Sequence, residues 1–372
     1  MTNTFLIKLY NYFAMKKTLF TLLTFMFCAA ICSQAQRISK DELKSLQVFL
    51  NQPAVEASTN AEALKISNIN NPASWEGVKI ENGNITEIHW SNKKLAGTLN
   101  LSGFKNLQKI DISKNKITSL SLANNPAIME INAGRNRISK FSVSNCPNIQ
   151  ILKLNRNQLP SINLDGIPLL SQLNVASNVL VDINVSNALN LKTLNCANNH
   201  LENIELAGCS NLRNLYLGYN DLTSITLTGL NKLENINIDS NKIGKLYIQG
   251  FENLQTVLCS SNHMSQLVIN DCRNLSDIDA PYNDLTTFNV NGCPNLAFID
   301  LEWNDLNYLD LSNQSFLQRL DVSNNQLLTL DVSNDSMLSF INLSGNYSLT
   351  DFRTFGCYSL RQIRGTWHDY NF

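Results

Sequence analysis

The stretch LRNLYLGYNDLTSITL, residues 212–227, contains the pattern that decides the fold of this 372-residue chain. Its apolar residues and one asparagine are spaced L-x-x-L-x-L-x-x-N-x-L-x-x-I-x-L, and this frame returns every 21 residues. Such a fixed period is typical of a solenoid, in which each repeat buries its apolar face by stacking on its neighbours. The asparagine occurs twelve times at this spacing: Asn115, Asn136, Asn157, Asn178, Asn199, Asn220, Asn241, Asn262, Asn283, Asn304, Asn325 and Asn346.

Each repeat is expected to contribute two short strands. If Leu107 is slot one of the first coil, slots four and six are apolar and alternate with polar residues, as a half-buried strand requires. Slots fourteen and sixteen repeat this alternation, for example at Leu330 and Val332. Stacked coils would therefore form a β-rich solenoid with two parallel sheets around one core. At about 4.8 Å per strand, about thirteen coils would span roughly 60 Å, and because both sides are extended we expect weak curvature.

Two turn positions close each coil. The slot-nine asparagine follows the first strand, where its amide can satisfy backbone groups of its own and neighbouring turns. A leucine there would leave those groups unpaired, at about 1–3 kcal/mol each. Slot eighteen holds only Gly, Asn and Asp, which tolerate a left-handed backbone. We therefore expect positive φ at Gly103, Asn124, Asn145, Gly166, Asn187, Gly208, Gly229, Gly250, Asp271, Gly292, Asn313 and Asn334.

The segments outside the repeats suggest export and capping. Residues 1–35 end in a secretory-signal pattern in which Met15 is the expected start, an apolar run follows, and cleavage is expected near Ala35. Residues 36–84 are predicted to form a helical N-terminal cap, with one helix over about 40–51 that starts at a capping box, Ser39 to Glu42, and a second around 61–66. Residues 85–347 are the repeats.

Residues 348–372 are predicted to close the C-terminal end of the array. The 21-residue frame slips by one position after Asn346. The apolar residues expected to form a closing coil are Phe352, Phe355, Cys357, Leu360, Ile363 and Trp367.

Two parts of the chain resemble leucine-rich repeat proteins. Residues 72–78, PASWEGV, and 95–99, LAGTL, resemble the W-x-G-V cap and opening coil of plant-type repeats, although the paired cysteines of that cap are missing. Residues 107–346 resemble the 21-residue repeats of secreted, internalin-like bacterial proteins, especially from the Bacteroidetes. LDVSNNQLLTLDVSN at 320–334 carries this likeness most clearly. The resemblance implies a leucine-rich repeat fold and export, but no particular ligand, because such scaffolds bind diverse partners.

The cysteines fit the repeat better than a metal or disulfide framework. Cys146, Cys209, Cys272 and Cys293 stand in slot nineteen, whereas Cys196 and Cys259 stand in slot six, where other coils hold apolar residues. We interpret them as small buried hydrophobes. Cys272 and Cys293 lie in adjacent coils and could come within bridging distance, although parallel stacking gives poor disulfide geometry. No CxxC pair is present, so a zinc site is not expected.

Catalytic motifs are missing from the sequence. It contains no GxSxG, HExxH or P-loop. His200 and His263 share slot ten but lie three coils apart, roughly 14 Å by strand spacing, which is too far to share one metal ion. A net charge of −1 gives no basic footprint for nucleic acid. We therefore expect neither an enzyme nor a cofactor.

Charges on the predicted exposed slots separate along the array. The first three coils supply the basic residues Lys109, Lys114, Lys116, Arg135, Arg137, Lys153 and Arg156. Coils nine and ten supply Asp277, Asp279, Asp284, Asp300, Glu302 and Asp305. Ordinary solvated charge explains such a distribution equally well.

Exposed aromatic residues accompany the acidic coils. Tyr282 and Trp303 are stacked neighbours in slot eight, and Asp279, Asp300 and Asp321 fill slot five of successive coils, where like charges destabilise one another. Aromatic side chains beside carboxylates suit a protein hot spot or a sugar platform, whereas the aspartates alone could hold calcium. The candidate binding surface is Tyr216, Tyr219, Asp279, Tyr282, Phe298, Asp300, Glu302, Trp303 and Asp305.

These observations favour a non-enzymatic exported recognition scaffold. A protein partner is the first expectation, because a long face with few deep pockets suits a large interface. A glycan-binding or adhesion protein, or a purely structural envelope component, is the alternative. We expect no nucleic acid, no membrane span in the mature chain, a monomer, and a location that is secreted, periplasmic or on the cell surface.

Overall fold

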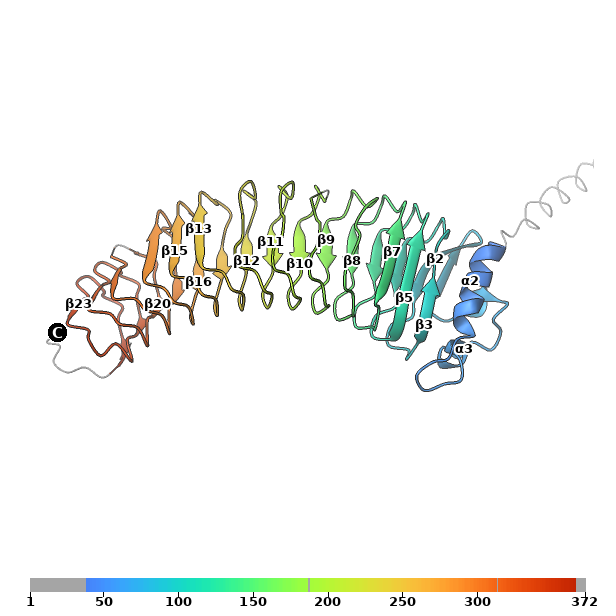
Figure 1. The fold of residues 1–372 in the computed structure, drawn as a ribbon, viewed down its shortest axis with the longest axis horizontal. Helices are drawn as coiled ribbons and strands as arrows, with labels where there is room; N and C mark the ends of the chain where they lie inside the picture. The colour runs from blue at the N-terminus through green and yellow to red at the C-terminus, as the bar shows by residue number, and fades with distance from the viewer. Residues whose placement is uncertain (1–37, 187, 313, 366–372) are drawn as a thin grey trace, which may run out of the picture.

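The computed structural model describes residues 38–186, 188–312 and 314–365. These residues form one row of stacked coils, bent into a shallow arch with helix α2 (Lys40–Leu50) at its N-terminal end (Figure 1). The predicted signal segment, residues 1–35, and Trp367 lie outside the described residues. No helix of the described part is long and apolar enough to cross a membrane.

One long sheet runs the length of the array. It has 15 strands, of which β1 and β2 pair antiparallel and the remaining neighbours pair parallel. The strands, in sheet order, are β1 (Val78–Glu81), β2 (Asn84–His89), β4 (Lys109–Asp111), β6 (Glu130–Asn132), β8 (Ile151–Lys153), β9 (Gln172–Asn174), β10 (Thr193–Asn195), β11 (Asn214–Tyr216), β12 (Asn235–Asn237), β14 (Thr256–Leu258), β16 (Asp277–Asp279), β18 (Phe298–Asp300), β20 (Arg319–Asp321), β22 (Phe340–Asn342) and β24 (Gln362–Arg364).

The register of this sheet follows the 21-residue period. Leu194 pairs with Leu215, which pairs with Ile236, and these slot-four side chains are buried throughout. Their neighbours in slots three and five point away from the core and are half-buried in most coils. The predicted β-rich leucine-rich repeat solenoid of about thirteen coils is confirmed.

The second wall is a sheet only in parts. It consists of three separate parallel sheets: β3 (Ala96–Asn100), β5 (Lys116–Ala123) and β7 (Lys140–Ser144); β13 (Lys245–Gln249), β15 (Gln266–Asn270) and β17 (Thr287–Asn291); and β19 (Tyr308–Asp310), β21 (Thr329–Asp331) and β23 (Asp351–Arg353). Between β7 and β13, the described residues hold only one isolated bridge on this side, Asn184 to Glu205. The continuous second sheet expected from the sequence is therefore interrupted.

Side chains in slot fifteen form local turn bonds in the interrupted part. Asn163, Asn184 and Glu205 each accept a hydrogen bond from the backbone N–H two residues later. Asp310 and Asp331 accept the same bond in the paired strands β19 and β21, so this bond alone does not decide whether a strand forms. In β5 and β13 the same slot holds Ser121 and Tyr247, and those strands extend through it.

The slot-nine asparagines join consecutive coils as predicted. The Nδ2 of Asn220 donates to the carbonyl oxygens of Leu217 in its own coil, at 2.9 Å, and of Cys196 in the preceding coil, at 3.1 Å. Its Oδ1 accepts from the backbone N–H of Leu201 at 3.0 Å. The other rungs repeat this arrangement, and all are buried except Asn136, which is half-buried.

The left-handed corner at slot eighteen is also confirmed. All ten described residues of this slot have φ between 52° and 88°. Asn187 and Asn313 lie outside the described residues.

The N-terminal cap differs from the prediction in its details. Helix α2 is one residue shorter at its C-terminal end, and Ser39 forms no side-chain capping bond, so the predicted capping box is wrong. The Glu42 side chain is buried instead, and desolvation raises the pKa of its carboxyl. The second helix, α3 (Asn60–Ala63), begins earlier than predicted because Thr59 accepts a capping bond from the N–H of Glu62.

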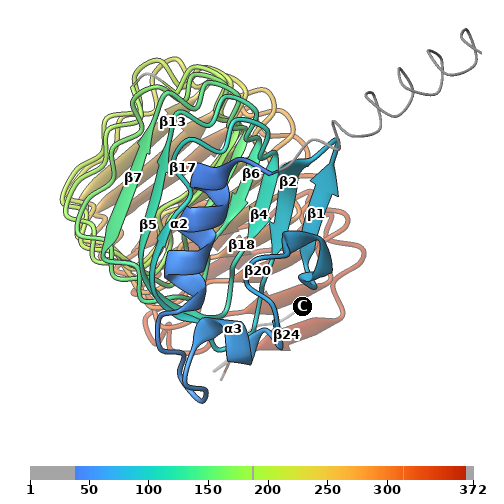
Figure 2. The same cartoon turned by 90° about the vertical axis from the view of Figure 1, so that its right-hand side faces the viewer.

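The cap covers the apolar end of the stack. Figure 2 looks along the array from this end, and α2 lies across it with β5 and β7 on one side and β2 and β4 on the other. Phe49 of α2 stacks on Trp90 with ring centroids 6.1 Å apart. A short 3₁₀ helix, η1 (Pro72–Ser74), precedes Trp75, whose ring packs against the same Trp90 at 6.5 Å.

At the C-terminal end, the one-residue slip appears in the strand register. Phe340 pairs with Gln362, 22 residues later, instead of 21. Four residues of the expected closing coil are half-buried against the core: Phe352, Cys357, Leu360 and Ile363. Phe355 stacks on the preceding coil through its backbone, since its carbonyl accepts from the N–H of Asn334, but its side chain is 79% exposed.

Candidate binding surface

Slot eight, directly before each asparagine rung, has a left-handed backbone that the sequence analysis missed. Its eleven non-glycine residues have φ between 52° and 59°, and Gly345 has φ of 82°. Among them are Tyr219, Tyr282 and Trp303, although bulky residues rarely adopt positive φ. The signal was hard to find because slot eight holds Lys, Arg, Ser and Tyr as well as Asn and Gly. This backbone projects the side chain outward: Tyr219 is 65% exposed.

Tyr282 and Trp303 form a stacked pair on this face. Their ring centroids lie 6.2 Å apart and their planes meet at 12°. Tyr282 is 52% exposed and Trp303 is 53% exposed, so each ring has a large solvent-facing area. Nearby Glu302 raises the pKa of the Tyr282 hydroxyl through its negative charge, and burial contributes as well.

The aspartates of slot five are aligned in register, as predicted, but most of them have a structural role. Asp279 pairs with Asp300 and Asp300 with Asp321 in adjacent strands. Asp300 accepts a bond from the N–H of Glu302, and Asp321 accepts from both the N–H and the hydroxyl of Ser323. Asparagines in other coils make the same bond to the residue two positions later. Asn or Asp in this slot therefore closes a turn, although three coils hold Lys153, Tyr216 and Leu258 there instead.

Asp279 departs from this pattern. The residue two positions later is Pro281, which has no N–H to donate. No other donor among the described residues reaches the carboxylate of Asp279. Burial raises the pKa of Asp279, and the charges of Asp239 and Glu302 raise it further. Asp279 is therefore a half-buried carboxylate that the fold itself does not use.

Burial likewise raises the pKa of Asp300, to about 6. The negative charges of Asp321, Glu302 and Asp279 add to this effect, whereas the bond from the Glu302 N–H opposes it. A hollow of about 480 Å³ lies over these strands. It is lined by Thr256, Leu258, Asp277, Ile278, Asp279, Phe298, Ile299, Asp300 and Arg319.

One cation borders this hollow. The Arg319 guanidinium lies over the Phe340 ring, with its Cζ 4.5 Å from the ring centroid. It forms no salt bridge with a carboxylate of the described chain. The carboxylates of the hollow therefore have no partner cation in direct contact.

The structure brings together seven of the nine candidate residues, all in coils nine and ten, and we call this group the acidic aromatic patch: Asp279, Tyr282, Phe298, Asp300, Glu302, Trp303 and Asp305. Tyr216 and Tyr219 lie three coils away. Tyr216 is half-buried in β11, and Tyr219 is exposed without a neighbouring ring in slot eight. A continuous surface from Tyr216 to Asp305 is therefore replaced by one compact patch and a separate tyrosine.

The basic residues of the first three coils are mostly exposed. Lys109 pairs with Glu130 at 2.7 Å, so its charge is compensated. Within the described residues, no salt bridge involves the other six: Lys114, Lys116, Arg135, Arg137, Lys153 and Arg156. These side chains lie in the first three coils, well separated from the acidic aromatic patch in coils nine and ten.

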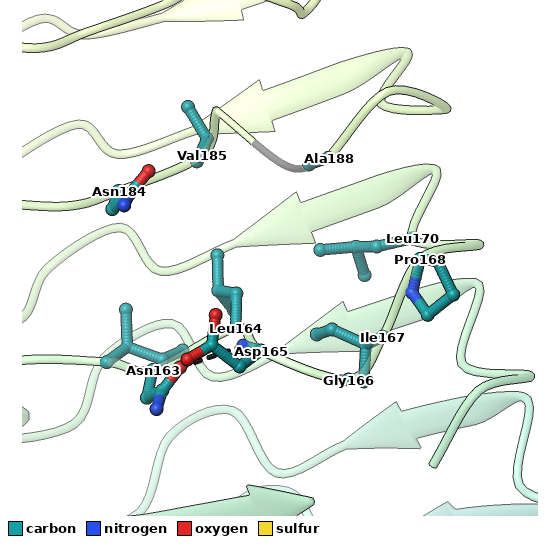
Figure 3. Close-up of a pocket in the computed structure, with 11 residues that line it drawn as sticks. Asn163, Leu164, Asp165, Gly166, Ile167, Pro168, Leu170, Asn184, Val185 and Ala188 are labelled. Atoms are coloured by element: carbon teal, nitrogen blue, oxygen red, sulfur yellow. Dashed lines mark hydrogen bonds between the residues drawn. The ribbon is translucent and has the colours of Figure 1, made fainter. Parts of the chain in front are cut away.

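A second hollow, of about 520 Å³, opens in the interrupted part of the second wall (Figure 3). Its lining is largely apolar and includes Ile162, Leu164 and Val185. Its lining also includes the polar side chains of Asn163, Asp165 and Asn184. Asn163 accepts from the N–H of Asp165, as the dashed line in Figure 3 marks. The hollow results from the missing strand pairing and contains no cysteine, histidine or cationic side chain.

Reactive groups in the described part of the chain are dispersed or buried. No group of three or more His, Cys, Asp or Glu side chains there could hold a metal ion. His200 and His263 are exposed, and each lies beside an aspartate of the next coil, at 3.9 Å and 3.5 Å. The described cysteines are free thiols, and burial raises the pKa of most of them.

Cys272 and Cys293 lie in adjacent coils, and each thiol donates to the backbone carbonyl two residues earlier, at 3.4 Å. Their mutual interaction lowers the pKa of Cys272 and raises that of Cys293. Both residues are buried within the stack.

No protein-family profile matches the chain, and no curated protein matches it. Among solved structures, YopM from Yersinia enterocolitica WA-314 is similar with a TM-score of 0.57 and 24% identity, over 70% of this chain and 60% of YopM. An internalin, inlF, from Listeria monocytogenes str. 4b F2365 gives a TM-score of 0.52 and 18% identity, over 84% of this chain and 94% of the internalin. The LRIM1/APL1C complex gives 0.50 and 18%, over 74% of this chain and 62% of the matched one.

These sequence identities are too low to indicate a shared function. The similar structures and the geometry of the coils do indicate the same fold. The chain spans about 60% of the length of YopM. Its stacked parallel strands and scarcity of helices match the architecture of YopM and the internalin. The chain therefore has the fold of a leucine-rich repeat protein.

Proposed function

We propose that this protein is a non-enzymatic recognition scaffold that binds a protein partner through the exposed face of its long sheet, centred on the acidic aromatic patch. The observation that carries the proposal is the stacked pair of Tyr282 and Trp303, which stay more than half exposed on an outward-projecting backbone. Exposed aromatic side chains of this size are typical centres of protein interfaces.

The surrounding geometry supports a macromolecular partner. The hollow of about 480 Å³ beside the pair is broad and lies on a sheet face, whereas a small-molecule site is usually a deep apolar cleft. The similar structures are repeat scaffolds, and one is by its name a complex of two proteins. A leucine-rich repeat array presents such a face to a large partner without further elements.

The test is a pull-down from host and bacterial surface material with the chain and with Tyr282→Asn, Trp303→Asn. Asparagine suits this slot because Asn198 and Asn324 already occupy it with φ of 57° and 54°. Tyr219→Asn is the matched control, since it removes an exposed slot-eight aromatic residue outside the patch. A specific protein should be retained by the chain and by the control but lost by the double variant. Equal retention by all three would refute the proposal.

A glycan is the second candidate, because an aromatic pair beside carboxylates also suits a sugar ring. A glycan array would show Trp303-dependent binding if this candidate is right. If the protein is instead a purely structural envelope component with no partner, the double variant should behave like the unchanged chain in both assays.

Export is part of the proposal and depends on residues 15–35, whose sequence has the charged start, apolar run and small-residue end of a secretory signal. N-terminal sequencing of the protein recovered outside the cytoplasm should begin near Gln36. Recovery of the full-length chain inside the cell would contradict export. The division into a cap at 36–84, repeats at 85–347 and a closing coil at 348–372 is likewise proposed, and limited proteolysis would test it.

A further inference from the structure

The Tyr282–Trp303 stack is open at both ends. In slot eight, the residue before Tyr282 is Ser261 and the residue after Trp303 is Asn324. These short side chains do not extend the stack, so no third slot-eight ring covers the outer faces of the pair. A planar group could therefore add to the stack from either side.

Negative charge surrounds this stack without compensation. Asp279, Asp300 and Glu302 form no salt bridge within the described residues. Asp279 lacks the turn-closing hydrogen bond of the other coils, because Pro281, two residues later, has no N–H. Among the described residues that line the neighbouring hollow, the one cation is Arg319, which lies over Phe340. A cationic partner would relieve the repulsion among these carboxylates, whereas a neutral sugar would leave it in place.

We propose that the acidic aromatic patch binds an arginine-bearing segment of the protein partner, with a guanidinium stacked on Tyr282 or Trp303 and paired with Glu302 and Asp279. This inference rests on the proposed function and assigns the chemistry that the partner presents. Arginine fits better than lysine because its planar group both stacks on an aromatic face and pairs with a carboxylate, whereas an ammonium is a compact, strongly hydrated charge.

The test measures the affinity of the chain for three labelled nine-residue homopeptides: nona-arginine, nona-lysine and nona-citrulline. Citrulline keeps a planar polar group of similar shape but carries no charge. We expect nona-arginine to bind about five-fold or more tightly than nona-lysine, and nona-citrulline not to bind measurably. Added salt should weaken the arginine binding, because part of it is electrostatic.

Four variants locate the binding. Trp303→Asn and Glu302→Gln should each weaken nona-arginine binding by about five-fold or more. Tyr219→Asn and Asp165→Asn, which alter an aromatic residue and a carboxylate outside the patch, should leave it unchanged. Circular dichroism and melting curves establish that each variant is folded before its affinity is compared.

Each outcome decides the question. Equal binding of nona-arginine and nona-lysine, or an affinity that Trp303→Asn does not change, would overturn the arginine assignment. If that assignment fails while the pull-down still shows Trp303-dependent capture of a protein, the proposed function stands with a different partner chemistry. If the glycan array alone responds to Trp303→Asn, both the arginine assignment and the protein partner are wrong.

Discussion

Replacing Asn220 with leucine tests what one asparagine rung contributes to the free energy of unfolding. The substitution keeps a similar volume but removes three hydrogen bonds of normal length, to the carbonyl oxygens of Cys196 and Leu217 and from the N–H of Leu201, together with a long one of 3.5 Å to the carbonyl oxygen of Gly218. These groups are not equally affected, because the rungs share acceptors. Cys196 keeps a bond from Asn199, and Leu217 keeps one from Asn241.

The expected cost follows from this sharing. The N–H of Leu201 is left without a partner in a buried turn, at about 1–3 kcal/mol, and the two shared bonds contribute about 0.5–1.5 kcal/mol each. The sum is roughly 2–6 kcal/mol. Urea denaturation followed by circular dichroism should show a lower midpoint. A suitable control is Asn203→Leu, since Asn203 is exposed and makes no hydrogen bond within the described chain. Asn214 is unsuitable because it is half-buried and accepts a bond from Asn235.

The shared acceptor makes a sharper test possible. In the double variant Asn220→Leu, Asn241→Leu, the carbonyl of Leu217 loses both donors, so the cost should exceed the sum of the single variants by about 1 kcal/mol or more. The pair Asn220→Leu, Asn304→Leu shares no acceptor and should be additive. Additivity in the adjacent pair, or a single-variant effect no larger than that of Asn203→Leu, would refute the rung mechanism.

Three further predictions concern buried charge, backbone conformation and pH. Asp335 is fully buried in slot nineteen with its Oδ2 unpartnered, and burial raises the pKa of its carboxyl from 3.8 to about 8. The folded-state pKa lies above the unfolded value, so this carboxyl lowers stability as the pH rises from about 4 to 8. Asp335→Asn should therefore raise the melting temperature at pH 8 and not at pH 3. Asparagine suits this slot, since Asn125 there donates to the carbonyl oxygen of Leu101. Gly345→Ala should destabilise more than Gly103→Ala in urea denaturation, because a Cβ at Gly345 would lie 2.9 Å from the Asn324 Cα whereas one at Gly103 meets nothing within 4 Å. Equal costs would contradict the close approach. Nona-arginine binding should weaken as pH falls from 7 to 5, since burial raises the pKa of Asp300 to about 6 and protonation removes its charge. An affinity that does not change between pH 7 and pH 5 would show that the charge of Asp300 does not contribute to nona-arginine binding.

The sequence was informative wherever every coil repeats the same constraint. Slot nine could be assigned because a leucine there would orphan a buried N–H, and slot eighteen because only three residue types appear in it. Slot eight has the same left-handed backbone but tolerates Trp303 and Tyr282, so its composition gave no signal. The interruption of the second wall had no such signal, because Asn163 in the interrupted part and Asp310 in β19 make the same turn bond in slot fifteen.

The candidate site could be predicted from the sequence only in part. Tyr282 and Trp303 could be paired from the period alone, because equal slots in adjacent coils must lie side by side. That Asp279 has no hydrogen-bond donor could not be predicted, because it depends on which N–H closes the turn in the other coils. Pro281 is visible in the sequence, but its effect requires knowing that Asp300 and Asp321 bond the residue two positions later.

Slot eight is well placed to carry recognition because its side chain is separated from the core. The eleven non-glycine slot-eight residues each donate their N–H to a carbonyl of the next coil, as Trp303 does to Ser323 and Tyr282 to Glu302, so the backbone is held whatever the side chain is. These backbone hydrogen bonds between coils offset the unfavourable free energy of positive φ. The side chain can therefore vary from Lys114 to Trp303 while the backbone keeps the same conformation. Substitution of Trp303 should therefore alter binding while leaving the fold intact, and a loss of folding in Trp303→Asn would show that recognition and scaffold are not separable at this slot.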